Sequence, residues 1–209
     1  MYRVFVVDDD PSVVKALSRL LRAQGYEVQP YTSPEAFLEN HDPSVPGCAV
    51  LDVSMPGLNG LELQQALTPA GGLSRSIVFL TGKGDIPMSV RAMRAGAVDF
   101  LTKPVNEQDL LAAIARAEGQ DIKLRRDYAE LAAIHRKIAS LTPREREVFA
   151  YVVAGRLNKQ IAGDLGTVEK TIKVHRGRMM EKLGVRTIAD LVRLAEKAGI
   201  SKPDPLISA

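Results

Sequence analysis

Tryptophan is absent from this 209-residue sequence, and cysteine occurs once, at Cys48. A single cysteine cannot form an internal disulfide, so this count excludes a disulfide-stapled fold and fits a reducing compartment. Because Cys48 stands in an apolar run, we interpret it as a small buried core residue.

Long apolar runs are also missing. The run at residues 4–7 stops at Asp8, and no stretch approaches the roughly 20 apolar residues that a membrane span requires. We therefore expect a soluble, cytoplasmic protein without an export signal or a membrane partner. With 45% hydrophobic and 25% charged residues, the composition is that of a globular protein rather than a disordered or fibrous one.

Positive charge is concentrated near the C-terminus. From Leu141 onward the chain has 13 Lys and Arg against 8 Asp and Glu, a net charge of +5, whereas residues 1–140 have 15 against 17, a net charge of −2. A basic C-terminal part suggests a polyanionic partner there.

Residues 1–118 alternate short apolar runs with helical patterns, which is typical of βαβ units. Apolar residues recur at helical spacing over 11–23, and Ser33 before Pro34 is typical of a helix start. We predict an α/β fold with a doubly wound, five-stranded parallel sheet. The predicted strands are 3–7, 27–31, 49–52, 77–81 and 98–101, and the other helices are 60–67, 86–95 and 107–117.

The rest of the chain is predicted to be helical. Residues 119–140 are polar with regularly spaced apolar residues, which indicates an amphipathic helical linker whose seam packs on a domain or on a partner chain. Residues 141–201 lack strand patterns and form short helical segments separated by glycines, so we predict an all-α four-helix domain followed by a tail at 202–209.

Chemically active residues stand where the predicted strands end. Asp8 and Asp9 follow the first strand, Asp52 closes the third, Thr81 closes the fourth and Lys103 follows the fifth. In parallel sheets these ends lie at one edge, where ligands bind, so we expect the side chains to converge. Any one of these residues, taken alone, is more often a turn, cap or solvated residue. Their convergence at one edge favours a functional site.

Three carboxylates in one pocket repel one another unless a hard cation supplies compensating charge, and Mg²⁺ is the natural candidate. Mg²⁺ would bridge the pocket to a phosphoryl donor, and a carboxylate can then act as the nucleophile that forms an aspartyl-phosphate. Lys103 would offset the added charge, and the hydroxyl of Thr81 would hydrogen-bond a phosphoryl oxygen. The sequence therefore predicts a phosphoacceptor site.

These motifs resemble the receiver domains of two-component response regulators over residues 1–118. The matching segments are VVDD at 6–9, LDVSMPG at 51–57, LTG at 80–82 and KP at 103–104. The resemblance implies that a sensor histidine kinase phosphorylates Asp52, that Asp9, Asp52 and the backbone carbonyl of Ser54 hold Mg²⁺, and that Asp8 helps through water. It also implies a cis peptide before Pro104 and a switch aromatic at Phe100, for which a plain core phenylalanine is the alternative.

Two further segments, 81–88 and 91–100, resemble the FixJ/NarL class in particular. The resemblance implies that the fourth helix and fifth strand form a dimer face that depends on phosphorylation. Lys83 stands where close relatives are expected to carry His.

The basic C-terminal part contains a candidate helix-turn-helix at 158–165 and 168–183. In the second helix, Ile172, Met179 and Leu183 fall on one face, and the opposite face is basic. A recognition helix needs such a face to reach phosphates and base edges, although a solvated basic face is the alternative.

The segments LTPRE at 141–145, NKQIA at 158–162, EKTIKVH at 169–175 and KLGV at 182–185 resemble the LuxR-type helix-turn-helix. The resemblance implies binding of double-stranded promoter DNA. It places Lys170, Lys173, Val174 and Gly177 at the major groove, and Asn158, Lys159, Arg176 and Arg178 at the DNA backbone.

This segment departs from the family pattern at residues 167–168, so we expect Thr167, rather than the next residue, to cap the recognition helix. Gly177 lowers helix stability by roughly 0.5–1 kcal/mol relative to Ala and removes a base-reading side chain. His175 lacks ligand partners at metal-binding spacing, so we interpret it as a packed or phosphate-contacting residue.

The sequence thus predicts a transcriptional regulator that dimerises on phosphorylation, and not an enzyme. Doubly wound phosphatases also use a strand-end aspartate, but they carry a second acid two residues later, where this chain has Ser54. A second alternative is a receiver whose C-terminal helices dock on a protein rather than on DNA.

Overall fold

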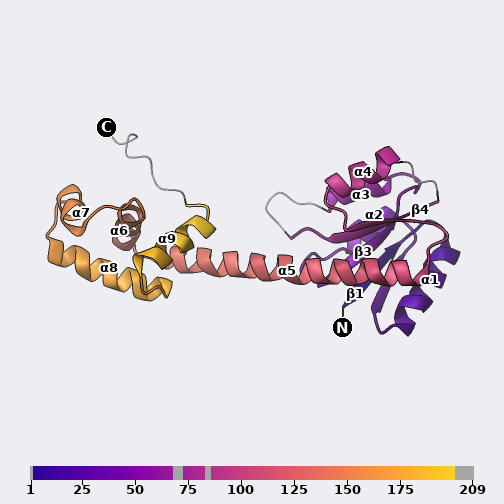
Figure 1. Cartoon of the computed structure of the whole chain (residues 1–209), viewed down its shortest axis with the longest axis horizontal. Coiled ribbons are helices and arrows are strands. Elements are labelled where there is room, and N and C mark those ends of the chain that lie inside the picture. The colour runs from indigo at the N-terminus through magenta and orange to yellow at the C-terminus, as the bar shows by residue number, and fades with distance from the viewer. Residues whose placement is uncertain (1, 68–72, 83–85, 201–209) are drawn as a thin grey trace. The chain divides into compact units, whose positions relative to one another are not determined.

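The computed structural model describes residues 2–67, 73–82 and 86–200; Lys83 and the tail predicted at 202–209 lie outside them. The chain divides into two compact units, Met1–Arg126 and Asp127–Ala209 (Figure 1). Within the described residues, no helix is long and apolar enough to cross a membrane.

The first unit is built on a parallel sheet with the strand order β2-β1-β3-β4-β5. All four strand pairs are parallel, which confirms the predicted doubly wound fold. The predicted bounds of the first two strands are correct, and those of the others differ by one or two residues. The strands are β1 (Arg3–Val7), β2 (Glu27–Tyr31), β3 (Gly47–Asp52), β4 (Ser76–Thr81) and β5 (Asp99–Thr102).

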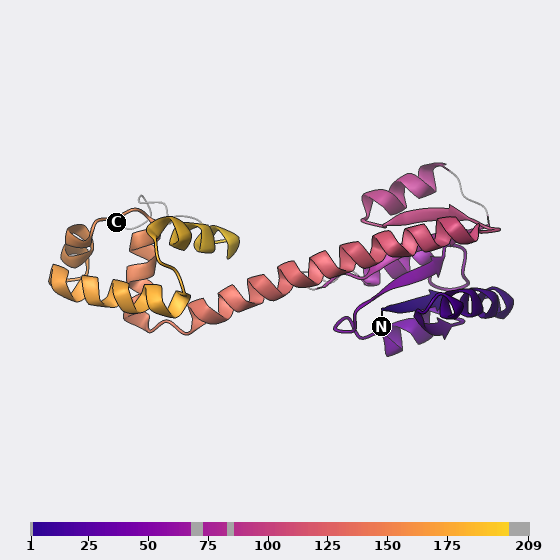
Figure 2. The ribbon, with the colours of Figure 1, turned by 60° about the horizontal axis from the view of Figure 1, so that its bottom comes forward.

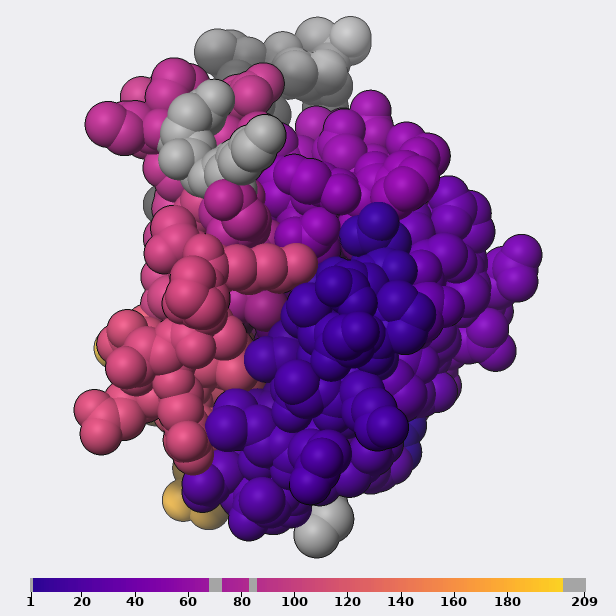
Figure 3. All heavy atoms as spheres, turned by 90° about the vertical axis from the view of Figure 1, so that its right-hand side faces the viewer, coloured from indigo at the N-terminus to yellow at the C-terminus, as the bar shows by residue number. Residues whose placement is uncertain are grey.

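Helices cover both faces of this sheet and bury its apolar residues. The helices α1 (Pro11–Ala23) and α5 (Glu107–Ala139) pack on one face, where Leu17, Leu21 and Ile114 lie in the core. The other face is covered by α2 (Pro34–Asn40), α3 (Gly60–Ala66) and α4 (Ile86–Arg94). The indigo N-terminal segment and pink α5 lie side by side on the face shown in Figure 3. Gln24, which follows α1, donates a hydrogen bond to Glu107 at the start of α5.

Side-chain caps fix where several of these helices begin. The carboxylate of Asp10 accepts a hydrogen bond from the backbone N–H of Ser12 at the start of α1, and the hydroxyl of Ser33 accepts one from Ala36 at the start of α2. At α3, Asn59 and Glu62 form a reciprocal capping box. These caps satisfy N–H groups that have no partner within the helix.

Helix α5 has 33 residues and runs without interruption through the segment that we predicted as a separate linker (Figure 2). The amphipathic pattern at 119–140 therefore continues the last receiver helix. Gly119 costs about 1 kcal/mol of helix stability, but no proline stands between Pro104 and Pro143 to end the helix.

A buried polar network fixes α5 at the sheet edge where β3 begins. The carboxylate of Asp121 is 1% exposed, accepts a hydrogen bond from the backbone N–H of Gly47 and pairs with Arg125 at 2.9 Å. Arg125 also donates to the carbonyls of Pro43, Ser44 and Val45. The network thus holds the loop before β3 against α5.

Arg75 completes this network from the start of β4. Its guanidinium is buried, donates to the carbonyls of Asp42, Val45 and Gly47, and lies 4.7 Å from the centre of the Phe5 ring. Its Nε donates to Nε2 of His41 at 3.2 Å. Burial, and then the charge of Arg75, lower the pKa of His41 to about 4, so the imidazole is neutral at pH 7 and can accept this bond.

As described over residues 127–200, the second unit consists of the last turns of α5 and four further helices: α6 (Pro143–Val153), α7 (Asn158–Asp164), α8 (Glu169–Leu183) and α9 (Ile188–Lys197). They enclose a core centred on Val148, Ile161, Ile172 and Leu191. The predicted four-helix domain is therefore present, with α7 and α8 as its helix-turn-helix.

We predict that Arg125→Ala lowers the free energy of unfolding of the first unit by about 2 kcal/mol, because the buried Asp121 carboxylate loses its ion-pair partner and the carbonyls of Pro43 and Ser44 lose their side-chain donor. Urea unfolding and amide hydrogen exchange in α5 would measure the loss. The adjacent exposed Arg126→Ala is the matched control, and equal stability of the two variants would contradict the prediction.

Candidate functional sites

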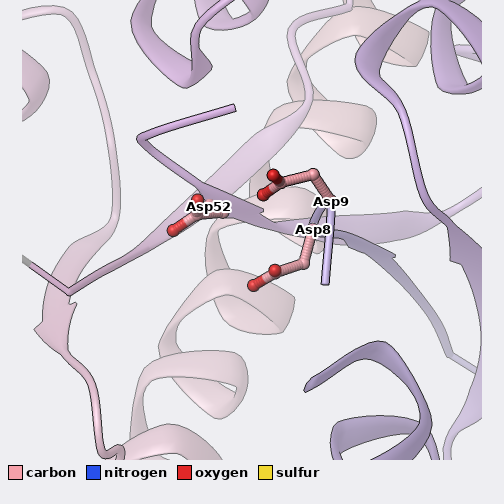
Figure 4. Close-up of side chains that lie close together, drawn as sticks. All are labelled: Asp8, Asp9 and Asp52. Carbon is pink, nitrogen blue, oxygen red and sulfur yellow. The ribbon is translucent and has the colours of Figure 1, made fainter. Parts of the chain in front are cut away.

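Three carboxylates converge at the carboxyl edge of the sheet, as predicted. Oxygen atoms of Asp8, Asp9 and Asp52 all lie within 4.8 Å of one another (Figure 4). Asp8 and Asp52 are buried, with 1% and 4% of their surface exposed, whereas Asp9 is exposed. The pairing of β1 with β3 positions them, because Val7 and Leu51 are aligned and the aspartates follow directly.

Lys103 reaches into this acidic pocket from the segment after β5. Its ammonium lies 2.5 Å from Oδ2 of Asp8 and 3.1 Å from Oδ1 of Asp52. Burial alone would lower the pKa of Lys103, but these two carboxylates outweigh it and raise the pKa. Burial raises the pKa of Asp8 despite its hydrogen bonds with Lys103 and the Asp10 backbone.

The other predicted receiver residues are Ser54, Thr81 and Phe100. The backbone N–H of Ser54 donates to Oδ2 of Asp52 at 3.1 Å, and Thr81 is fully buried at the end of β4. Phe100 is partly buried and its ring centre lies 6.1 Å from that of Phe79. The peptide bond between Lys103 and Pro104 is cis, which confirms that expectation.

This donor set fits a hard divalent cation. Carboxylate oxygens are the preferred protein ligands of Mg²⁺, and an exposed group such as Asp9 leaves room for the waters that this ion retains. Lys103 supplies one positive charge against three carboxylates, so a net negative charge remains for a cation to offset. The pocket is therefore typical of magnesium binding in receiver domains.

In the second unit, α8 has one buried and one basic face, as predicted. Ile172, Met179 and Leu183 are buried in the core. The predicted DNA-facing residues Lys170, Lys173, Val174, Gly177 and Arg178 are all exposed. Lys173 forms an exposed ion pair with Glu169 at 3.1 Å, which holds its ammonium weakly and leaves it available to DNA.

Arg176 and Asn158 join the two helices of the helix-turn-helix. Nη1 of the half-buried Arg176 donates to Oδ1 of Asn158 at 2.8 Å, while the neighbouring Lys159 is exposed. The sequence placed both paired residues at the DNA backbone but did not reveal that they contact each other. The bond orients the guanidinium and leaves its other donors free to bind a phosphate.

The expected cap by Thr167 is wrong. The residue before α8 is Val168, which provides no side-chain hydrogen bond, and the backbone N–H of Thr167 instead donates to the carbonyl of Ala162. This bond closes the turn after α7, so Thr167 belongs to that turn and not to the start of α8. At Gly177, among the described residues, no atom lies within 4 Å of where a Cβ would stand, so packing does not require glycine there.

An ion pair between the buried Glu145 and the exposed Lys182, which sequence reasoning missed, joins α8 to α6. Glu145 accepts hydrogen bonds from Lys182 at 2.6 Å and from the backbone N–H of Thr142 at 2.9 Å. The hydrogen bond from Lys182, followed by that from Thr142, lowers the pKa of Glu145 to about 2. Both residues belong to the motifs noted above, but nothing in their spacing indicates that they pair.

Comparison with known proteins identifies both units. Residues 4–115 match the model of the response regulator receiver domain, and residues 139–195 match that of the bacterial regulatory proteins of the luxR family. The chain belongs to the response-regulator family. A receiver joined to a LuxR-type helix-turn-helix is the organisation of a two-component transcriptional regulator, which is the function of this chain.

Relatives of this response regulator align over nearly its whole length. Nodulation protein W of Bradyrhizobium diazoefficiens is 44% identical over 95% of this chain and 87% of the relative. The response regulator TodT of Pseudomonas putida is 42% identical over 93% and 85%, and the transcriptional regulatory protein FixJ of Rhizobium meliloti is 38% identical over 95% and 97%.

Solved structures agree with this assignment. A structure of the response regulator StyR is 48% identical, covers 93% of this chain and 98% of its own, and has a TM-score of 0.80. Full-length FixJ from B. japonicum is 38% identical, covers 95% of this chain and 98% of its own, and has a TM-score of 0.55.

We predict that acid destabilises the DNA-binding unit of this regulator partly through Glu145. Since its folded pKa of about 2 is below its ordinary value of 4.5, its stabilising effect is present above about pH 4.5 and is lost as the pH falls toward 2. The free energy of opening of α6 and α8, measured by hydrogen exchange between pH 5 and 2, should therefore depend less on pH in Glu145→Gln than in wild type. Glu147→Gln, at an exposed neighbour, should behave as wild type; identical pH dependence in all three proteins would contradict the prediction.

Proposed function

We propose that a sensor histidine kinase phosphorylates this regulator at Asp52, and that the phosphorylated receiver dimerises and binds promoter DNA in the cytoplasm. The observation that carries the proposal is the convergence of Asp8, Asp9, Asp52 and Lys103 at one sheet edge. Lys103 neutralises part of the negative charge of this pocket. A phosphoryl group arriving at Asp52 would therefore compete with Asp8 for the ammonium of Lys103.

Asp9, Asp52 and the backbone carbonyl of Ser54 would hold Mg²⁺, with Asp8 acting through a water. When bound, Mg²⁺ would offset the charge of the carboxylates and of the phosphoryl donor. A carboxylate oxygen of Asp52 would attack the phosphorus atom of the kinase's phosphohistidine, so that an O–P bond forms while the P–N bond breaks and the imidazole leaves. Lys103 and the Thr81 hydroxyl would stabilise the phosphoryl oxygens. Phe100 would change position together with Thr81.

We propose a regulator rather than an enzyme that turns over a substrate. Ser54 stands two residues after Asp52, where a phosphatase of this sheet type would need an acid, and a hydroxyl is a poor general acid. The phosphoryl group on Asp52 would therefore serve as a signal.

The dimer face would include α4 and β5. Ile86, Val90 and Met93 follow one another at i, i+4 and i+7 on α4 and are 79%, 42% and 45% exposed. An apolar stripe on a surface helix is a common element of protein interfaces. Joining two receivers brings two helix-turn-helix units to paired half-sites, so the second DNA contact becomes effectively intramolecular.

We expect beryllofluoride with Mg²⁺ to convert the wild-type protein from monomer to dimer in sedimentation velocity, and Asp52→Asn to stay monomeric because it cannot hold the phosphoryl mimic. Asp164→Asn, an exposed acid of the DNA-binding unit, is the matched control and should dimerise like wild type. A shift to dimer in Asp52→Asn, or the absence of a shift in wild type, would contradict phosphorylation-driven dimerisation.

We expect Lys173→Ala to weaken promoter binding about five- to tenfold and to reduce the preference for the promoter over unrelated DNA, because its ammonium would face base edges in the major groove. Arg193→Ala removes an exposed charge from α9 and should change neither quantity. Fluorescence anisotropy with promoter DNA and with unrelated DNA would measure both. Unchanged DNA binding in Lys173→Ala would favour the alternative in which this unit docks on a protein.

A further inference from the structure

A groove runs along the edge of the receiver sheet that is formed by β2, which within the described residues pairs with β1 alone. Its volume is about 580 Å³, and α1, β2 and the first turn of α2 line it. Val14, Pro30 and Ala36 give it an apolar lining. This volume falls within the range of small-ligand sites, about 300–1,000 Å³.

The α1 side of the groove is cationic and has no counter-charge of its own. Lys15, Arg19 and Arg22 line the groove at i, i+4 and i+7, so they share one face of α1. No Asp or Glu occurs within α1, and among the residues that the structure describes no carboxylate pairs with any of the three. Arg22 donates one hydrogen bond, to the carbonyl of Val28. Neighbouring like charges repel, and an anion in the groove would relieve this repulsion.

Two hydroxyl groups beneath the groove add hydrogen-bonding capacity. Ser18 and Tyr31 line it and are 3% and 9% exposed, and within the described part of the chain neither hydroxyl has a hydrogen-bond partner. Buried hydroxyls are usually paired, so both are candidates to bond a ligand after a small shift of the atoms that cover them.

We propose that this groove binds a small organic anion that combines an apolar body with one carboxylate or phosphate group. A bare anion would satisfy the cations but not the apolar lining, and a neutral apolar molecule would leave the three cations unpaired. The groove shares no residue with the acidic pocket, so this proposal is independent of the phosphorylation of Asp52.

The test is a titration of the full-length ¹⁵N-labelled protein with benzoate as the probe, followed through backbone amide shifts. We expect saturable shifts confined to α1, β2 and α2. Benzyl alcohol, which keeps the ring but lacks the charge, and inorganic phosphate, which lacks the ring, should each bind about tenfold more weakly.

Two charge-removing variants distinguish binding in this groove from general attraction of the anion to a basic protein. Arg19→Gln should weaken benzoate binding about fivefold, whereas Lys123→Gln, which removes the same charge from an exposed position on α5, should leave it unchanged. Asp52→Asn should bind as wild type, so failure of the phosphorylation proposal would leave this result intact.

Three results would overturn the proposal: shifts that do not saturate, equal weakening in Arg19→Gln and Lys123→Gln, or phosphate binding as tightly as benzoate. Tighter binding of an Asp- and Glu-rich peptide at the same amides would also overturn it, because the groove would then be a protein-docking surface.

Discussion

Mutual repulsion among the carboxylates at the sheet edge is the constraint around which the receiver is arranged. Parallel pairing of β1 with β3 brings Asp8 and Asp52 together, and both are almost completely buried. Buried charges are costly unless they are paired, and Lys103 contacts both carboxylates. Since one ammonium cannot neutralise three carboxylates, the pocket keeps a net negative charge, which is typical of a magnesium site.

The same strand connects this pocket to the helix that leads toward the DNA-binding unit. β3 ends at Asp52 and begins at Gly47, whose backbone N–H is bonded to Asp121 of α5. The acidic pocket and the network around Arg125 therefore lie at opposite ends of one fully buried strand. Because the hydrogen bonds of Asp121 and Arg125 hold α5 at this end, the position of the helix on the receiver is well defined.

The sequence predicted the parts of this protein that depend on local patterns. Strand-end positions followed from short apolar runs, and the acidic site followed from them because parallel strands end at one edge. The continuity of α5 was missed because a polar segment with Gly119 was interpreted as a linker. The network of Arg75, Asp121 and Arg125 could not be predicted, since these residues are distant in sequence from the loop carbonyls they contact. Thr167 was misassigned because α8 begins at Glu169, so that Val168 is the residue before the helix and Thr167 belongs to the turn after α7.

The recognition helix shows how such tertiary contacts free surface positions for function. α8 has no side-chain cap at its N-terminus and contains β-branched residues and Gly177, all of which disfavour an isolated helix. Its stability must come from elsewhere: from Ile172 and Met179 in the core, from the Lys182–Glu145 pair, and from Lys137, which donates to the carbonyl of Leu183 at its C-terminal end. None of these contacts uses the exposed face. The residues on that face can therefore serve DNA binding without serving folding. This explains how a helix of low intrinsic stability can present Lys170, Lys173 and Arg178.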